Sequence, residues 1–184
     1  AGLLPTIVQA SLEKLPIPKR MRWGAGEAQF VRPVHWIVLL FGTDTLPAML
    51  LDTQAGNTTR GHRFHAPAPI TLAAPGEYAG ALATRGKVIA SFAARRERIR
   101  AAGEAKAKEI GGRAILGEAL LDEVTALVEW PVPIAGRFEE RFLALPREVL
   151  ISTLQDHQRY FAVEDAAGKL LTSFITVSNI ESRE

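Results

Sequence analysis

The apolar segments of this 184-residue chain are short and irregularly spaced, and this pattern limits its fold more than any other feature. The longest apolar run, Trp36–Phe41, has the length of a strand and falls far short of the roughly 20 residues that span a bilayer. Helical and strand-like segments follow one another without a regular strand–helix–strand repeat. The sequence therefore predicts an α+β fold, with a mixed or antiparallel sheet and packed helices.

Helical periodicity and end signals predict five helices. Thr6 is expected to cap the first. Ser91 is expected to cap the longest, whose apolar face runs to Ile110 and which ends at Gly111 and Gly112. The expected helices cover residues 6–14, 75–86, 91–110, 116–128 and 146–154.

Apolar and β-branched runs bounded by turn residues predict the strands. Residues 159–163 and 170–178 are expected to pair as a hairpin around the turn Asp165–Lys169. The run 34–41 is expected to pair with 46–51 in the same way. Further strands are expected at residues 58–64, 70–72, 88–90 and 132–138.

Composition is typical of a folded domain, with 47% hydrophobic and 23% charged residues. The length fits one α+β domain over residues 1–184, with a helical subregion over 75–130. The absence of cysteine excludes disulfides, a thiolate zinc site and a cysteine nucleophile, and it fits a reducing compartment. Because the chain starts at Ala1 and stops in the charged tetrad Glu181–Glu184, we expect it to be a segment of a longer protein.

Positive charge is concentrated in one short segment, although the formal net charge is only +2. Residues 85–113 hold nine basic and three acidic side chains, whereas residues 114–184 hold six basic and twelve acidic ones. Arginine supplies 16 of the 22 basic residues, and its planar guanidinium pairs with phosphate through two hydrogen bonds. The pattern favours a nucleic acid or an acidic protein as partner and predicts salt-sensitive RNA binding, with a solvated helix face as the alternative.

Three short strings combine arginine, histidine and aromatic residues: Arg32–Trp36, Thr58–Phe64 and Asp156–Phe161. Guanidinium groups donate to phosphates, and exposed rings stack on unpaired bases. Each string can instead be explained by structure alone, as core packing or as an ordinary solvent-exposed surface. The candidate nucleic-acid contacts are Arg60, His62, Arg63, Phe64, Arg95, Arg96, Arg98, Arg100, His157, Arg159 and Tyr160.

Signatures of catalysis and of metal binding are missing from the sequence. Gly24 and Gly26 lack the third glycine of a dinucleotide fingerprint, and no phosphate loop ending in Gly-Lys-Ser/Thr occurs. His62 and His65 have arginine neighbours and no nearby carboxylate, which disfavours a metal site. Polar residues near His157 are expected to line one helix rather than form a triad. We therefore predict no catalytic residue and no metal ligand.

Six ordered strings resemble a known family. They are LPIPKRMRWG, FVRPVHWIVLLFG, TTRGHRF, LLDEVTALVEWPVPIAGRF, LPREVLISTLQDHQRYF and SNIESRE. In this order they are similar to the beta subunit of bacterial glycyl-tRNA synthetases, over essentially all 184 residues. The resemblance implies an internal segment from the N-terminal half of a longer subunit.

The resemblance implies an α2β2 cytoplasmic enzyme that attaches glycine to its tRNA. The alpha subunit holds the site for glycine, ATP and magnesium, so no cofactor is expected in this segment. The beta subunit recognises tRNA, and its front region resembles the α+β editing-type domain of the phenylalanyl-tRNA synthetase beta subunit. We therefore expect a non-catalytic domain for tRNA recognition or architecture. A purely structural scaffold is the main alternative, and hydrolytic editing is less favoured because glycine is the smallest amino acid.

Overall fold

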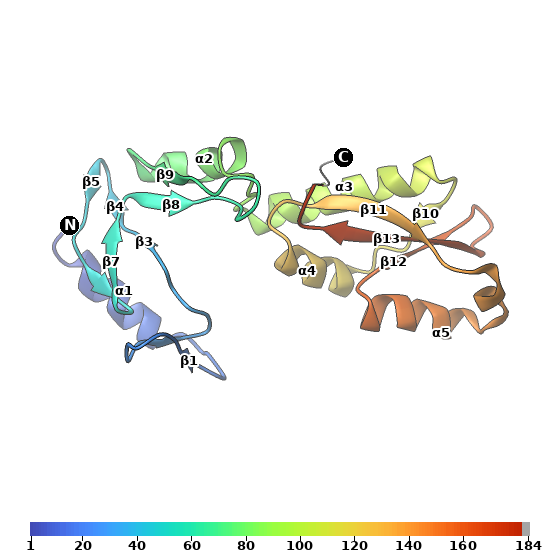
Figure 1. Cartoon of the computed structure of the whole chain (residues 1–184), viewed down its shortest axis with the longest axis horizontal. Coiled ribbons are helices and arrows are strands. Elements are labelled where there is room, and N and C mark those ends of the chain that lie inside the picture. Colours follow the sequence, from blue (N-terminus) through green and yellow to red (C-terminus); the bar gives the residue numbers. More distant parts are fainter. Residues whose placement is uncertain (182–184) are drawn as a thin grey trace. The chain divides into compact units, whose positions relative to one another are not determined.

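The computed structural model describes residues 1–181, so the last three residues of the string Ser178–Glu184 lie outside it. The chain divides into two compact units: residues 1–86 form unit 1, and unit 2 begins at Lys87. Both contain helices and short sheets, so the predicted α+β class is confirmed (Figure 1). The assignment of residues 1–184 to one α+β domain, with a helical subregion over 75–130, stays a prediction. No helix in residues 1–181 is long and apolar enough to cross a membrane.

Unit 1 is built from small sheets with strands of two to four residues. Strand β7 is central to the largest sheet, because it pairs in parallel with β3 and antiparallel with β6. Three antiparallel pairs, β1–β2, β4–β5 and β8–β9, surround it in sequence. The bounds are α1 Leu4–Glu13, β1 Met21–Arg22, β2 Gln29–Phe30, β3 Ile37–Val38, β4 Leu40–Phe41, β5 Asp44–Thr45, β6 Met49–Leu50, β7 Thr53–Gly56, β8 Thr58–Arg60, β9 Pro69–Thr71, the 3-10 turn η1 Pro75–Glu77 and α2 Tyr78–Thr84.

The end of α2 packs closely against the turn that follows β8. A Cβ atom on Gly61 would lie 2.4 Å from the carbonyl oxygen of Gly86, so only glycine fits there without movement. The amide of His62 donates to the same oxygen at 2.6 Å. The glycine in the TTRGHRF string therefore serves an internal backbone contact. The small core of unit 1 includes Leu46, Leu50, Ala55, Ile70, Leu72, Ala81 and Leu82.

Unit 2 is built on one antiparallel sheet of four strands in the order β10–β12–β13–β11. The predicted hairpin is confirmed, because β12 and β13 pair across a turn that Asp165 closes by accepting from the amides of Ala167 and Lys169. The bounds are α3 Phe92–Glu109, β10 Arg113–Ala114, α4 Glu118–Leu127, β11 Val132–Arg137, the 3-10 helix η2 Glu140–Ala144, α5 Arg147–Ser152, the π-helix η3 Thr153–His157, β12 Phe161–Glu164 and β13 Leu170–Ser178.

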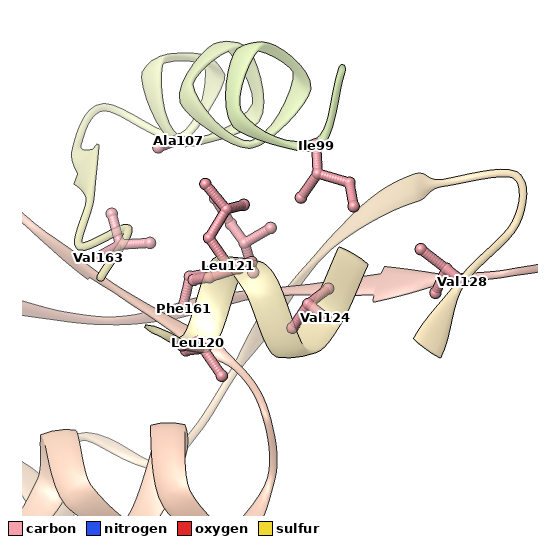
Figure 2. Close-up of a cluster of buried hydrophobic side chains, with 9 residues drawn as sticks. Ile99, Ala107, Leu120, Leu121, Val124, Val128, Phe161 and Val163 are labelled. Atoms are coloured by element: carbon pink, nitrogen blue, oxygen red, sulfur yellow. The ribbon is translucent and has the colours of Figure 1, made fainter. Parts of the chain in front are cut away.

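Helices cover both faces of this sheet, because successive side chains of a strand point to opposite sides. Phe161 and Val163 join the cluster under α3 and α4, whereas Ala162 joins Leu150 of α5 on the other face. Figure 1 shows α3 and α5 on opposite sides of the sheet. In Figure 2, Ile99 and Ala107 of α3 point toward Leu121 of α4, and all three are almost fully buried.

Several helix ends follow the sequence signals. The Ser91 hydroxyl accepts from the amide of Ala94 and caps α3, as predicted. Gly111 follows α3 with a φ of +79°, a left-handed conformation that glycine adopts without strain. Thr6 was the wrong cap, because α1 begins at Leu4 and has no side-chain cap. Pro5 fixes a helical φ in the first turn and favours this earlier start.

Other expectations for local structure were wrong. Residues 88–90 form no strand; Ile89 instead donates its amide to the carbonyl of Glu129. The run 34–41 is broken into β3 and β4, and β4 pairs with β5 because Gly42, with φ +62°, makes a tighter turn than expected. Apolar periodicity over residues 116–128 would place Leu127 in the core, but Leu127 is 63% exposed because it lies in the last turn of α4.

Candidate nucleic-acid interface

The TTRGHRF string presents two arginines and a ring to solvent. Strand alternation on β8 buries Thr59 and exposes Arg60, and the turn that follows exposes Arg63 and Phe64. The Arg63 guanidinium lies 5.8 Å from the centre of the Phe64 ring, which is 59% exposed. Neither arginine makes an ion pair among the described residues. The string therefore offers two free phosphate donors next to a stacking surface.

His62 has a different role from its neighbours, because it is only 1% exposed. Its Nδ1 accepts from the amides of Phe64 and His65, both at 3.2 Å, and so holds the turn. Nδ1 therefore carries no proton, which leaves the proton on Nε2. Nε2 is buried and has no partner among residues 1–181. The assignment of His62 as a tRNA contact stays a prediction, but this geometry favours an internal role.

The arginines of α3 are mostly engaged by the protein itself. Arg95 donates to the backbone carbonyls of Thr125 at 2.9 Å and Ile89 at 2.6 Å. Arg96 pairs with Asp122 and Glu118, and Arg100 pairs with Glu118 at 2.8 Å. Three of the four predicted contacts on α3 are thus held by α4 or by neighbouring backbone.

The pKa shifts of the paired side chains on α3 and α4 reflect these ion pairs. Hydrogen bonds from Arg100 and Arg96 hold the pKa of the Glu118 carboxyl below its ordinary value. Hydrogen bonds from Asp122 and Glu118 raise the pKa of the Arg96 guanidinium. Both groups therefore stay charged, and part of the cationic block is neutralised within unit 2.

Arg98 is the exception on α3, and it lies on an aromatic ring. Its guanidinium lies 4.5 Å from the ring centre of Trp130, and the Lys87 ammonium lies 4.8 Å from the same ring. The Trp130 indole N–H donates to Glu181 at 2.6 Å. Asn179 accepts from the backbone amide of Trp130 at 3.0 Å. The EWP and SNIE portions of the recognised strings therefore meet in one structural cluster.

Residues of the string Asp156–Phe161 also make contacts within the protein. Arg159 has a φ of +59° at the end of the π-helix η3, and its guanidinium pairs with Glu123 of α4. The Tyr160 ring stacks on Phe174 with centroids 4.5 Å apart and planes 4° apart. His157 is exposed. One face of Tyr160 is therefore covered, and the roles of His157, Arg159 and Tyr160 toward tRNA stay predictions.

The described residues contain no group of three or more His, Cys, Asp or Glu side chains that could hold a metal ion. Ser152 at the end of α5 donates to Asp156 of the following η3 at 2.7 Å, one helical turn away. A serine and an acid on successive helical turns do not by themselves make a nucleophile with a base and an orienting group. The site chemistry that the geometry supports is recognition of anions and rings.

Sequence reasoning missed a cleft in unit 1 that Thr59, Trp36 and Tyr78 help to line. The signal was the Arg32–Trp36 string, whose tryptophan the explanation by core packing placed inside the protein. Trp36 is 43% exposed and Tyr78 is 41% exposed. The pairing partners of the α3 arginines, Glu118 and Asp122, were also missed, because they follow 18 to 26 residues later in the chain.

Comparison with known proteins defines the family. A family model described as glycyl-tRNA synthetase beta subunit matches residues 1–184. Proteins named glycine–tRNA ligase beta subunit are similar along the whole chain. The one from Marinobacter nauticus is 54% identical over 99% of this chain, and those from Hahella chejuensis and Pseudomonas aeruginosa LESB58 are each 55% identical over 100% of it.

The chain therefore belongs to the glycyl-tRNA synthetase beta subunit family, a family of aminoacyl-tRNA synthetase subunits. The resemblance of the six strings is confirmed. The chain spans about a quarter of the length of these relatives: 26% for the first two and 27% for the Pseudomonas protein.

Proposed function

We propose that this chain is a non-catalytic tRNA-recognition segment of a glycine–tRNA ligase beta subunit. The observation that carries the proposal is the exposed, unpaired set of Arg60, Arg63 and Phe64 in unit 1. Two guanidinium groups that need not break an ion pair are well suited to phosphate oxygens. An exposed ring beside them is suited to an unpaired base.

The proposal includes the parent enzyme. That enzyme attaches glycine to its tRNA in the cytoplasm, with ATP and magnesium bound by an alpha subunit in an α2β2 assembly. Membership of the family supports this activity for the full-length protein. This segment contributes binding and positioning rather than chemistry.

The charge distribution within unit 1 supports an anionic partner. Seven of the eight basic residues in residues 1–86 make no ion pair among the described residues, and only Arg22 does, with Glu27. All eight are exposed. Cationic side chains that bind the phosphates of RNA displace its condensed counterions, and this release makes the binding sensitive to salt concentration.

The experiment is the double variant Arg60→Ala/Arg63→Ala in the full-length enzyme. The KM for tRNA should rise, because each lost charge-assisted hydrogen bond costs roughly 1.5–3 kcal/mol, or about one to two powers of ten. The free energy of unfolding should change by less than about 1 kcal/mol, because both side chains are exposed. Steady-state aminoacylation and thermal melting measure the two quantities on one protein.

Arg141→Ala is the matched control, because Arg141 is exposed but already paired with Glu139. It should leave both the KM and the melting temperature unchanged. A double variant that melts early and keeps its KM for tRNA would contradict the proposal and favour a scaffold role for the string.

The scaffold alternative has its own supporting observations. His62 is buried, Gly61 packs on Gly86, and Arg95, Arg96 and Arg100 bind within unit 2. Under this alternative the recognised strings stabilise the subunit and do not touch tRNA. The double variant separates the alternatives because Arg60 and Arg63 are outside those internal contacts. The scaffold alternative therefore predicts an unchanged KM for tRNA, whether or not the melting temperature falls.

A likeness of the fold to the editing-type domain of the phenylalanyl-tRNA synthetase beta subunit remains part of the proposal. Editing itself is the less favoured function. The imidazole Nδ1 of His62 is occupied by two backbone amides, which leaves it unable to act as a base there. Release of glycine from charged tRNA by the purified segment would favour editing instead.

A further inference from the structure

Unit 1 contains a cleft of about 460 Å³ with aromatic side chains at its mouth. Trp36 comes from the segment before β3, and Tyr78 begins α2, so separate elements supply the two rings. Both are about two-fifths exposed. The remaining lining is Val38, Leu39, Leu40, Thr59, Leu72 and Pro75. A cleft of this size, lined by apolar side chains together with a few polar groups, is typical of small-ligand sites.

One polar group in the cleft has no partner. Thr59 is only 2% exposed, and its hydroxyl makes no hydrogen bond among the described residues. The hydroxyl is not among the described side-chain atoms that are fully buried without a partner, so it keeps access to the cleft and can bond to whatever enters it. The Trp36 indole N–H and the Tyr78 hydroxyl also have no partner among residues 1–181. The cleft therefore presents stacking surfaces together with unused donors and acceptors.

Unit 1, which contains the cleft, is cationic as a whole. It carries eight basic and five acidic side chains, and among the described residues only Arg22 of these basic ones makes an ion pair. A flat ring attached to a phosphate suits both features: its apolar faces suit the cleft, and its negative charge suits the net charge of unit 1.

We infer that this cleft binds one unpaired nucleobase of an RNA. The base stacks on Trp36 or Tyr78, its polar edge or its ribose hydroxyl bonds to Thr59, and the flanking phosphates lie in the positive field of unit 1. The inference rests on the proposed tRNA role and adds the kind of nucleotide recognised: an unstacked one, because a paired base cannot enter a cleft. Stacking on a protein ring tolerates any base, so any selectivity among bases must come from the hydrogen bond to the Thr59 hydroxyl.

A protein side chain is the competing occupant, and the Thr59 hydroxyl and the net charge of unit 1 argue against it. An apolar side chain would fill the volume but would leave the Thr59 hydroxyl unpaired and gain nothing from the free cations of unit 1. An unpaired nucleotide uses both features. The competing occupant is therefore an outcome that the experiment must detect.

The first measurement is photo-crosslinking of full-length enzyme to tRNA that carries 4-thiouridine, with the linked peptides identified by mass spectrometry. We expect a nucleotide linked to the peptide that contains Trp36 or to the one that contains Tyr78. Links confined to the peptide of Phe64 would overturn the inference while leaving the proposed function intact. Absence of links anywhere in residues 1–86 would overturn both.

The second measurement compares tRNA dissociation constants of variants. Trp36→Leu should weaken binding about 5- to 100-fold, because it removes one stacked base. Trp36→Phe keeps a ring and should bind within about threefold of the parent. Thr59→Val keeps the shape but loses the hydroxyl, and it should weaken binding about 2- to 10-fold.

The two failures are distinguishable. If Arg60→Ala/Arg63→Ala weakens binding but Trp36→Leu and Thr59→Val do not, the cleft inference fails and the tRNA role stands. If Trp36→Leu lowers the melting temperature and leaves the dissociation constant unchanged, the cleft packs against protein and the inference also fails. Should Trp36→Leu not fold, Thr59→Val still decides, because it removes only a hydrogen bond.

Discussion

The two units use the same residue type in opposite ways. In unit 1, seven of eight basic side chains make no ion pair among the described residues. In unit 2, seven of the thirteen described basic side chains are ion-paired, and three others bind backbone carbonyls or Trp130. A high density of arginine in the sequence therefore does not locate the free positive surface. A basic side chain stays free only where the fold brings no acidic side chain next to it.

The units also differ in how they are held together. Unit 2 has a four-stranded sheet packed on both faces, whereas unit 1 has sheets of two or three short strands and a helix α1 with no buried residue. A larger buried core provides more hydrophobic stabilisation. Unit 1 leaves more apolar and cationic groups for partners. We therefore expect substitutions to reveal a rigid unit 2 and a recognition surface on unit 1.

The largest expected effect is on the core of unit 2. Phe161→Ala removes a fully buried ring from the cluster under α3 and should lower the free energy of unfolding by about 3–5 kcal/mol. Leu127→Ala on α4 is the control, and because Leu127 is 63% exposed it should cost less than about 1 kcal/mol. Denaturant unfolding gives both values. Equal losses would show that the core is not where the stability of unit 2 resides.

The next effect tests the tight contact in unit 1. Gly61→Ala places a methyl group against the Gly86 backbone and should cost about 1–3 kcal/mol through a forced backbone shift. Gly80→Ala in α2 is the control, because nothing lies within 4 Å of its added Cβ, and it should stabilise by up to about 1 kcal/mol. Thermal melting separates the two. A neutral Gly61→Ala would show that this turn adjusts freely.

A smaller effect concerns the buried carboxylate of unit 2. A hydrogen bond from Arg113, joined by one from Arg147, holds the pKa of Glu164 below its ordinary value despite burial. A depressed folded pKa adds stability above the unfolded pKa, and this stability is lost as pH falls below about 4.5 through the folded value. Glu164→Gln should cost about 1–2 kcal/mol at pH 7 and flatten this acid dependence.

Glu148→Gln is the matched control for the acid limb, because Glu148 is exposed and forms no ion pair among the described residues. It should leave the stability profile between pH 3 and pH 7 unchanged. Measurement of unfolding midpoints across that range tests the pair. An unchanged profile in Glu164→Gln would contradict the prediction, because it would mean that the ion pairs of Glu164 with Arg113 and Arg147 add no stability.

The last prediction concerns the salt dependence of tRNA binding rather than stability, and it is the most direct test of the comparison. The sequence assigns salt-sensitive RNA binding to residues 85–113, whereas the ion pairs favour unit 1. Arg60→Gln/Arg63→Gln should flatten the log–log salt slope of tRNA binding by about 0.7–0.9 per lost phosphate contact. Arg96→Gln/Arg100→Gln should leave the slope unchanged, because both are held by Glu118. The reverse result would restore the sequence-based assignment.

Local signals predicted local structure well. Ser91, Gly111 and the spacing between them specify α3, because capping and left-handed glycine act within a few residues. The β12–β13 hairpin followed for the same reason, since the turn at Asp165 lies between its strands. The short strands of unit 1 were less predictable, because at two to four residues each they carry little periodicity.

The same distinction between local and long-range information applies to the candidate site. The sequence by itself determined the family, the α+β class and the strings in which arginine, histidine and aromatic residues meet. Only the tertiary structure decided which members of those strings face solvent. Arg96 is paired because α4 brings Glu118 and Asp122 to it, and His62 is buried because its ring holds a turn against α2. Exposure and pairing depend on contacts between residues far apart in the chain, and a linear pattern does not contain those distances.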